Sequence, residues 1–291
     1  MDWQPDWGLR ARMFLTMFLL FALYIVFAGV ITAYMGGGIL IFGLLFGGLS
    51  LVQYYYSDTL TLKSMGAKTV SADEYPQLHA SVDRLSQQAD LPKPTVAVVD
   101  SDVPNAFATG RNQKNAAVAV TTGLMRTLDQ DELDGVIAHE LAHIKNRDMM
   151  VMTFASLLAT IAFMIVRWGA FFGGGRNRQG GGVVVAILVS LLVWIISYIL
   201  MRALSRYREF AADRGAAAIT GNPSALASAL LTISGEVDKV PDNDLREEAE
   251  MNAFFIIPIK SGIVGRLFST HPATERRVEA LRELEREMTG F

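Results

Sequence analysis

The sequence contains no cysteine, few charged residues and only four histidines. Without cysteine the protein can form neither a disulfide framework nor a thiolate metal site, so histidine, aspartate or glutamate must hold any transition metal. Charged residues make up 19% of the chain, below the roughly 25% of soluble proteins. The net charge is −3 and there is no block rich in Lys and Arg, so nucleic acid is not an expected partner. Hydrophobic residues make up 51% of the chain, which indicates a membrane protein.

Four long apolar runs account for the hydrophobic excess: residues 13–34, 39–56, 149–172 and 183–201. Runs of this length are typical of helices that cross about 30 Å of hydrocarbon. The glycine-rich stretch "MGGG" (35–38) separates the first two runs, and "GGGRNRQGGG" (173–182) separates the last two. We therefore predict four transmembrane helices in two hairpins. The first run is not expected to be a cleaved signal peptide, because a second run follows at once.

The hairpins divide the chain into four predicted segments. These are an N-terminal transmembrane hairpin (1–56), a first polar part (57–148), a second hairpin (149–204) and a second polar part (205–291). An even number of spans precedes each polar part, so both are expected on the same side of the bilayer. Most Lys and Arg residues near the spans would lie on that side, which predicts a cytoplasmic face; Arg176 and Arg178 in the distal loop oppose this assignment.

The polar parts predict a mostly helical, zincin-like α+β domain with a small sheet. Residues 73–89 have the spacing of an amphipathic helix. Residues 95–100, 105–110 and 116–125 are typical of β-strands, the last two joined in a hairpin. The C-terminal stretch 271–288 alternates in charge at helical spacing, which favours a solvated surface helix.

Asp129 and Glu132 form a capping-box pattern that predicts the start of another helix. This helix carries "DELDGVIAHELAHIKNRD" (131–148) and is expected to run almost straight into the third span. His139 and His143 lie four residues apart on one face of it, where both rings can reach one ion. Glu140 lies where it can accept a proton from an attacking water. The pattern therefore predicts the HExxH helix of a zinc hydrolase.

A catalytic zinc requires three protein ligands and an open position. The candidates for the third ligand are His79, His271 and several carboxylates. The chain leaves through the third span and returns through the fourth over helical lengths of about 43 Å and 39 Å, so "SRYREFAAD" (205–213) returns to the depth of "HELAH". There Glu209 could bind the metal and Asp213 could accept the second N–H of a histidine ligand. A surface carboxylate pair is the alternative.

Several separated motifs resemble one known family. "HELAH" is followed about 70 positions later by "REFAAD", with a membrane hairpin between them. "PNAFATG" (104–110) and "STHPATERRV" (269–278) occur in the same order relative to these motifs as in the family. The chain resembles, over nearly its whole length, the HtpX membrane metalloproteases, which are relatives of the zinc-dependent CAAX prenyl endopeptidases.

The resemblance implies one zinc ion per chain, held by His139, His143 and Glu209, with Glu140 as general base. It also implies that Asn105 and His271 bind the scissile peptide or stabilise the oxyanion. The alternative for Asn105 is a turn residue, and for His271 a residue at the start of a helix. His79 lies away from every motif and is expected at the surface.

The expected activity is zinc-dependent hydrolysis of peptide bonds at the cytoplasmic surface of the plasma membrane. A peptide could bind extended, as a strand added to the edge of the 95–122 sheet. The resemblance implies quality control of misfolded or damaged membrane proteins. A prenyl-protein endopeptidase is the first alternative, although that family has more spans around a larger chamber. A non-catalytic adaptor with a structural zinc is the second, which the presence of Glu140 opposes.

Overall fold

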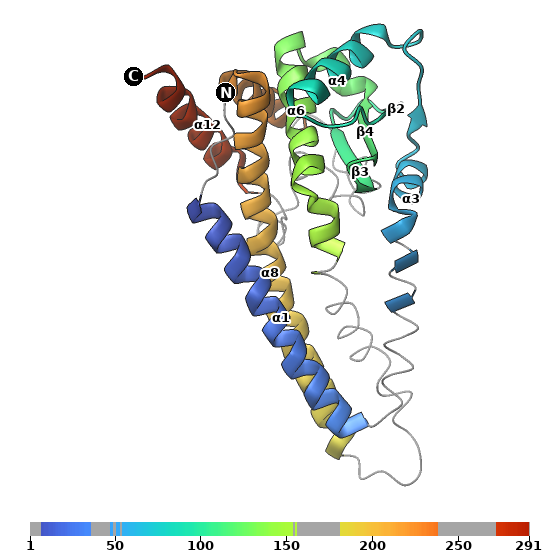
Figure 1. Ribbon diagram of the computed structural model, residues 1–291, viewed down its shortest axis with the longest axis vertical. Coiled ribbons are helices and arrows are strands. Elements are labelled where there is room, and N and C mark those ends of the chain that lie inside the picture. Colours follow the sequence, from blue (N-terminus) through green and yellow to red (C-terminus); the bar gives the residue numbers. More distant parts are fainter. Residues whose placement is uncertain are drawn as a thin grey trace. The chain divides into compact units, whose positions relative to one another are not determined.

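The structure is a computed structural model that describes residues 7–35, 47–48, 51–52, 54–153, 155, 181–237 and 272–290 (Figure 1). The chain divides into two compact units. The first consists of the described residues of Tyr56–Met149 and Arg206–Phe291, and the second of those of Trp7–Tyr55 and Met150–Ser205.

The second unit contains α1 (Trp7–Met35) and most of α8 (Gly181–Thr220). Among the described residues these are the two helices whose length and composition suit a membrane span. Leu20, Tyr24 and Phe27 of α1 pack in one cluster with Val193 of α8. Large apolar side chains on both helices point outward, as expected for surfaces that face lipid. Most of the second and third predicted spans, 39–56 and 149–172, lies outside the described residues, so those two spans stay predictions.

The first unit is built on a four-stranded mixed sheet. The strands are β1 (Lys68–Thr69), β2 (Thr95–Val99), β3 (Ala106–Asn112) and β4 (Asn115–Thr121). Their order is β1-β2-β4-β3, with β2 and β4 parallel and the other two pairs antiparallel. The predicted hairpin is therefore present as β3 and β4, and β3 is an outer strand of the sheet that the described residues form.

The strand predicted over 116–125 is too long at its end. Residues Thr122–Thr127 form the helix α5, because the Thr121 hydroxyl accepts a hydrogen bond from the Leu124 N–H and caps a helix N-terminus. The unit also contains the helices α3 (Ser57–Ser64), α4 (Pro76–Gln88), α6 (Gln130–Asn146), α9 (Pro223–Val237) and α12 (Thr274–Thr289), together with the end of α8 from Arg206.

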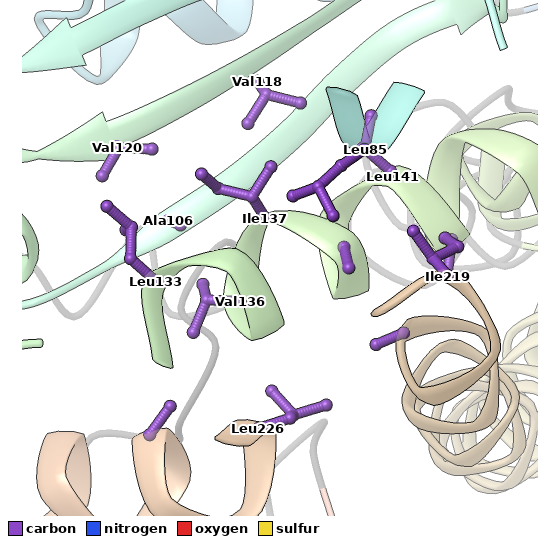
Figure 2. Close-up of a cluster of buried hydrophobic side chains, with 14 of the residues drawn as sticks. Leu85, Ala106, Val118, Val120, Leu133, Val136, Ile137, Leu141, Ile219 and Leu226 are labelled. Carbon is purple, nitrogen blue, oxygen red and sulfur yellow. The ribbon is translucent and has the colours of Figure 1, made fainter. Parts of the chain in front are cut away.

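Helix α6 lies at the centre of the core of the first unit. Figure 2 shows Ile137 of α6 turned toward Val118 of the sheet, while Val136 is turned toward Leu226 of α9. A Cβ on Gly135 would lie 3.0 Å from the Leu226 backbone nitrogen, so α6 and α9 approach closely at this glycine. Packing on both sides explains why the residues of α6 are buried from Leu133 to Ala142.

The two ends of α6 differ in how well they match the sequence prediction. The predicted capping box is present, with the Asp129 carboxylate accepting from the Glu132 N–H and the Glu132 carboxylate accepting from the Asp129 N–H. The helix predicted to carry 131–148 ends two residues early, at Asn146, because Arg147 adopts left-handed φ/ψ of 57° and 37°. Helical residues resume at Asp148.

Helix α12 also departs from the prediction of a solvated surface helix. Arg277, Val278 and Leu281 are buried on one face of it, and the last two belong to the same core cluster as α6. Only its other face is exposed, because residues three and four positions apart share a helix face and the face of Arg277, Val278 and Leu281 packs inward.

Candidate active site

The three proposed metal ligands meet in the first unit although they come from two separate helices. Helix α6 supplies His139 and His143, and α8 supplies Glu209. The two Nε2 atoms are 3.1 Å apart. The Glu209 carboxylate lies 3.6 Å from each of them, with Oε2 nearest His139 and Oε1 nearest His143. Three side chains so placed could hold one metal ion.

These separations fit a tetrahedral metal ion. With bonds of about 2.0–2.1 Å, ligand atoms at the corners of a tetrahedron are about 3.3–3.4 Å apart, close to the observed 3.1 and 3.6 Å. Two imidazoles and one carboxylate also form the donor set of a catalytic zinc, which leaves a fourth position for water or substrate.

The charges around the cluster also favour a divalent cation. With both histidines neutral, as metal ligands are, and every carboxylate ionised, the described residues around the cluster place four buried carboxylates against two buried guanidinium groups, an excess of two negative charges. The carboxylates are Glu140, Asp148, Glu209 and Asp213, and the guanidinium groups are Arg208 and Arg277. Excess charge inside a protein is costly unless it is paired or bound to a metal, so one divalent ion would balance the site.

Glu140 is buried between the histidines and the sheet. Burial raises the pKa of its carboxyl, against the opposing effect of the two histidines. The carboxylate accepts a hydrogen bond from the backbone N–H of Ala108. Ala108 belongs to the outer strand β3, so Glu140 joins the metal ligands to the edge of the sheet. A carboxylate of raised pKa beside a metal site is suited to proton transfer.

Each histidine has a carboxylate next to its other ring nitrogen. Asp213 Oδ1 lies 3.0 Å from Nδ1 of His139, and Asp148 Oδ2 lies 2.6 Å from Nδ1 of His143. Asp213 was expected from the sequence to serve a histidine, whereas Asp148 was not. Residues 143 and 148 do not share a face of a continuous helix, and the helix was expected to continue.

Arg277 is a member of the site that the sequence prediction missed. Its guanidinium group is 1% exposed and donates two hydrogen bonds to Asp213, with Nε 2.9 Å from Oδ2 and Nη2 2.6 Å from Oδ1. Its Nη1 lies 3.4 Å from Glu209 Oε2. Burial raises the pKa of Asp213, but the charge of Arg277 and the hydrogen bonds from His139 and Arg277 together outweigh burial and hold this pKa below its usual value. The sequence did contain a signal for its burial, because Arg277 lies next to Val278 and four residues before Leu281, the two apolar residues of the buried face of α12.

The surroundings of His139 favour a positive charge at this position. Burial and the nearby Arg277 both lower its pKa, but the hydrogen bonds to Asp213 and Glu209 together with the charge of Asp213 outweigh them and raise this pKa to about 9. The two carboxylates therefore create a negative potential where the ring nitrogens converge. A metal cation would be attracted by the same groups.

The remaining predicted residues are not metal ligands of this cluster, or lie outside the described residues. Asn105 is buried just before β3, and its backbone is fixed by two hydrogen bonds with Thr121. His271 lies outside the described residues. His79 is partly buried on α4, where Nε2 is 3.1 Å from the Val70 carbonyl oxygen, and it does not belong to the metal cluster.

Comparison with known proteins agrees with this geometry. The family model described as peptidase family M48 matches residues 72–285. Protease HtpX homolog 2 of Methanosarcina mazei is 55% identical and covers 99% of both chains. The protease HtpX homolog of Moorella thermoacetica is 56% identical over 97% of this chain and 96% of its own.

A solved structure adds a likeness of fold. The crystal structure of S. mikatae Ste24p is similar with a TM-score of 0.54 at 16% sequence identity. The alignment covers 89% of this chain, which spans 62% of the length of that protein. The resemblance to the HtpX metalloproteases is thus confirmed: the chain belongs to peptidase family M48 and is a membrane metalloprotease.

Proposed function

We propose that the protein is a zinc endopeptidase that cleaves misfolded or damaged membrane proteins at the cytoplasmic face of the plasma membrane. The observation that carries the proposal is the convergence of His139, His143 and Glu209 beside the buried Glu140. In this proposal residues 57–148 and 205–291 form the catalytic domain, and residues 1–56 and 149–204 are membrane hairpins. The cytoplasmic orientation rests on the Lys and Arg residues that flank the spans.

The protein side chains would share the chemistry as follows. A zinc ion held by the three ligands would supply a Lewis acid that acidifies water and polarises the peptide carbonyl. Glu140 accepts the proton of the attacking water and then passes a proton to the leaving amine. The raised pKa of Glu140 favours this exchange, because its carboxyl can be protonated and deprotonated during one cycle. We further propose that Asn105 and His271 bind the scissile peptide or its oxyanion.

The outer strand β3 is the proposed binding site for the substrate backbone. The N–H of Ala108 reaches Glu140, so this strand borders the proposed reaction centre. An extended peptide that pairs with β3 would bring its main chain alongside Glu140. Pairing through main-chain hydrogen bonds reads little of the side-chain sequence, which suits a protease that acts on many unfolded proteins.

The deciding experiment compares the wild type with Glu140→Gln, both zinc-loaded in detergent, on an unfolded membrane protein. Glu140→Gln should keep one zinc per chain and lose at least about a hundredfold in cleavage rate, since the proton acceptor is removed. Asp131→Asn is the matched control, because Asp131 is an exposed carboxylate on the same helix. Equal cleavage by wild type and Glu140→Gln would sink the mechanism. Cleavage restricted to a farnesylated peptide would instead support the prenyl-protein alternative.

A further inference from the structure

The two ligand histidines have parallel surroundings. His139 contacts Asp213, and Asp213 accepts hydrogen bonds from Arg277. His143 contacts Asp148, and Arg208 Nε lies 3.2 Å from the second carboxylate oxygen of Asp148. Asp148 is 1% exposed, as is Asp213. The repetition of histidine, aspartate and arginine around one proposed metal suggests that both aspartates have the same task.

A break in the helix brings Asp148 to His143. On an uninterrupted α-helix, residues five positions apart point about 140° away from each other around the axis. Arg147 interrupts α6 with a φ of 57°, and this turn brings the Asp148 carboxylate back to within 2.6 Å of His143 Nδ1. Left-handed backbone costs a residue with a side chain roughly 1–2 kcal/mol. A costly turn next to a buried carboxylate is typical of a site whose geometry has a function.

Arg208 forms an ion pair with Asp148 from α8, the helix that carries the third ligand. It lies on α8 immediately before Glu209, and its side chain is largely buried. Asp148 Oδ2 lies next to His143 of α6, while Oδ1 pairs with Arg208 of α8 through charge and not through a hydrogen bond. The ion pair therefore places the end of α6 beside the Glu209 segment of α8.

We propose that Asp148, turned inward by Arg147 and held by Arg208, is the positioning residue of His143. It accepts a hydrogen bond from the Nδ1–H, which leaves Nε2 without a proton and directed toward His139 Nε2 and Glu209. Partners of this kind fix the tautomer and ring orientation of a ligand histidine and raise its basicity. This inference rests on the proposed zinc site and adds a residue that neither the motif nor its spacing indicated.

The test measures zinc affinity rather than proteolysis. Full-length wild type, Asp148→Ala, Asp148→Asn and the control Asp83→Asn are stripped of metal in detergent and titrated with zinc against a chromophoric chelator. Asp148→Ala should bind zinc about 10- to 100-fold more weakly. Asp148→Asn should fall between, because an amide oxygen can still accept from Nδ1–H. Asp83 is a half-exposed carboxylate paired with Lys93, and its variant should match the wild type.

Cobalt absorption separates positioning from a merely structural role. The visible spectrum of the Co²⁺-loaded protein reports the arrangement of the ligands and should change in Asp148→Ala. A variant with lower thermal stability but wild-type zinc affinity and cobalt spectrum would overturn the inference. Failure of the wild type itself to bind one zinc would overturn the proposed function as well, so the two failures are distinguishable.

The turn at Arg147 provides a second test if Asp148→Ala does not fold. Arg147→Gly keeps the left-handed turn at lower cost, whereas a β-branched side chain opposes it. Arg147→Val should therefore weaken zinc binding more than Arg147→Gly. Equal affinities in these two variants would show that the turn does not position His143.

Discussion

Replacing Arg277 by alanine removes the positive charge from the centre of the site. The guanidinium group makes two short contacts to Asp213 and a longer one to Glu209, and it is almost fully buried. Without it the Asp213 carboxylate would stay buried without its main counter-charge. Removing one partner of a buried ion pair costs about 3–5 kcal/mol, a large share of the 5–15 kcal/mol that stabilises a typical protein.

Hydrogen exchange of the α6 amides is the suitable assay for Arg277→Ala. Tryptophan fluorescence would report elsewhere, because the four tryptophans, at positions 3, 7, 168 and 194, lie outside α6. At tenfold per 1.36 kcal/mol, the loss should accelerate exchange in the metal-free protein on the order of a hundredfold to several thousandfold. Arg276→Ala is the matched control, since this neighbouring arginine is exposed and should change stability by less than about 0.5 kcal/mol.

A double variant tests whether the cost comes from the ion pair. Arg277→Met combined with Asp213→Asn removes both charges of the Arg277–Asp213 pair, so it should recover part of the stability lost in Arg277→Ala. If Arg277→Ala exchanges no faster than Arg276→Ala, the pair does not stabilise the site and the reasoning is refuted. Equal losses from Arg277→Met with and without Asp213→Asn would likewise contradict the coupling.

Two further predictions concern the helix that carries the histidines. Gly135→Ala should destabilise the protein by about 1–3 kcal/mol, because the new Cβ lies 3.0 Å from the Leu226 backbone. As its control, Gly235→Ala in α9 places a Cβ with no atom within 4 Å and should stabilise the protein by up to about 1 kcal/mol. Thermal unfolding checks both, and shifts of the same sign would contradict the close approach of α6 and α9. Asp129→Ala removes the N-terminal cap of α6 and should destabilise the helix by about 1 kcal/mol. Faster hydrogen exchange of the amides in the first turn of α6 would show this loss, whereas unchanged exchange there would mean that the capping box does not stabilise the helix.

Local patterns in the sequence predicted the elements that local physics controls. The strand-like stretches 105–110 and 116–125 predicted the β3–β4 hairpin, and Asp129 with Glu132 predicted the start of α6, because hydrogen bonds within a few residues decide both. The end of α6 was not predictable in this way. A left-handed residue after a helix is usually glycine or asparagine, and arginine at 147 gives no such signal.

The arrangement around the histidines was decided by tertiary packing. The sequence by itself determined that "HELAH" lies on a helix and that long apolar helices accompany the polar parts, two of which the described residues include. It did not place Arg277, 64 positions from Asp213, in the site, since arginine on a charged helix is normally solvated. That arginine is buried because α12 packs its Val278 and Leu281 face on the core, and the buried carboxylates then supply the partners that make its burial tolerable. Periodicity along a chain shows which residues share a face, but only the packed structure decides which faces meet.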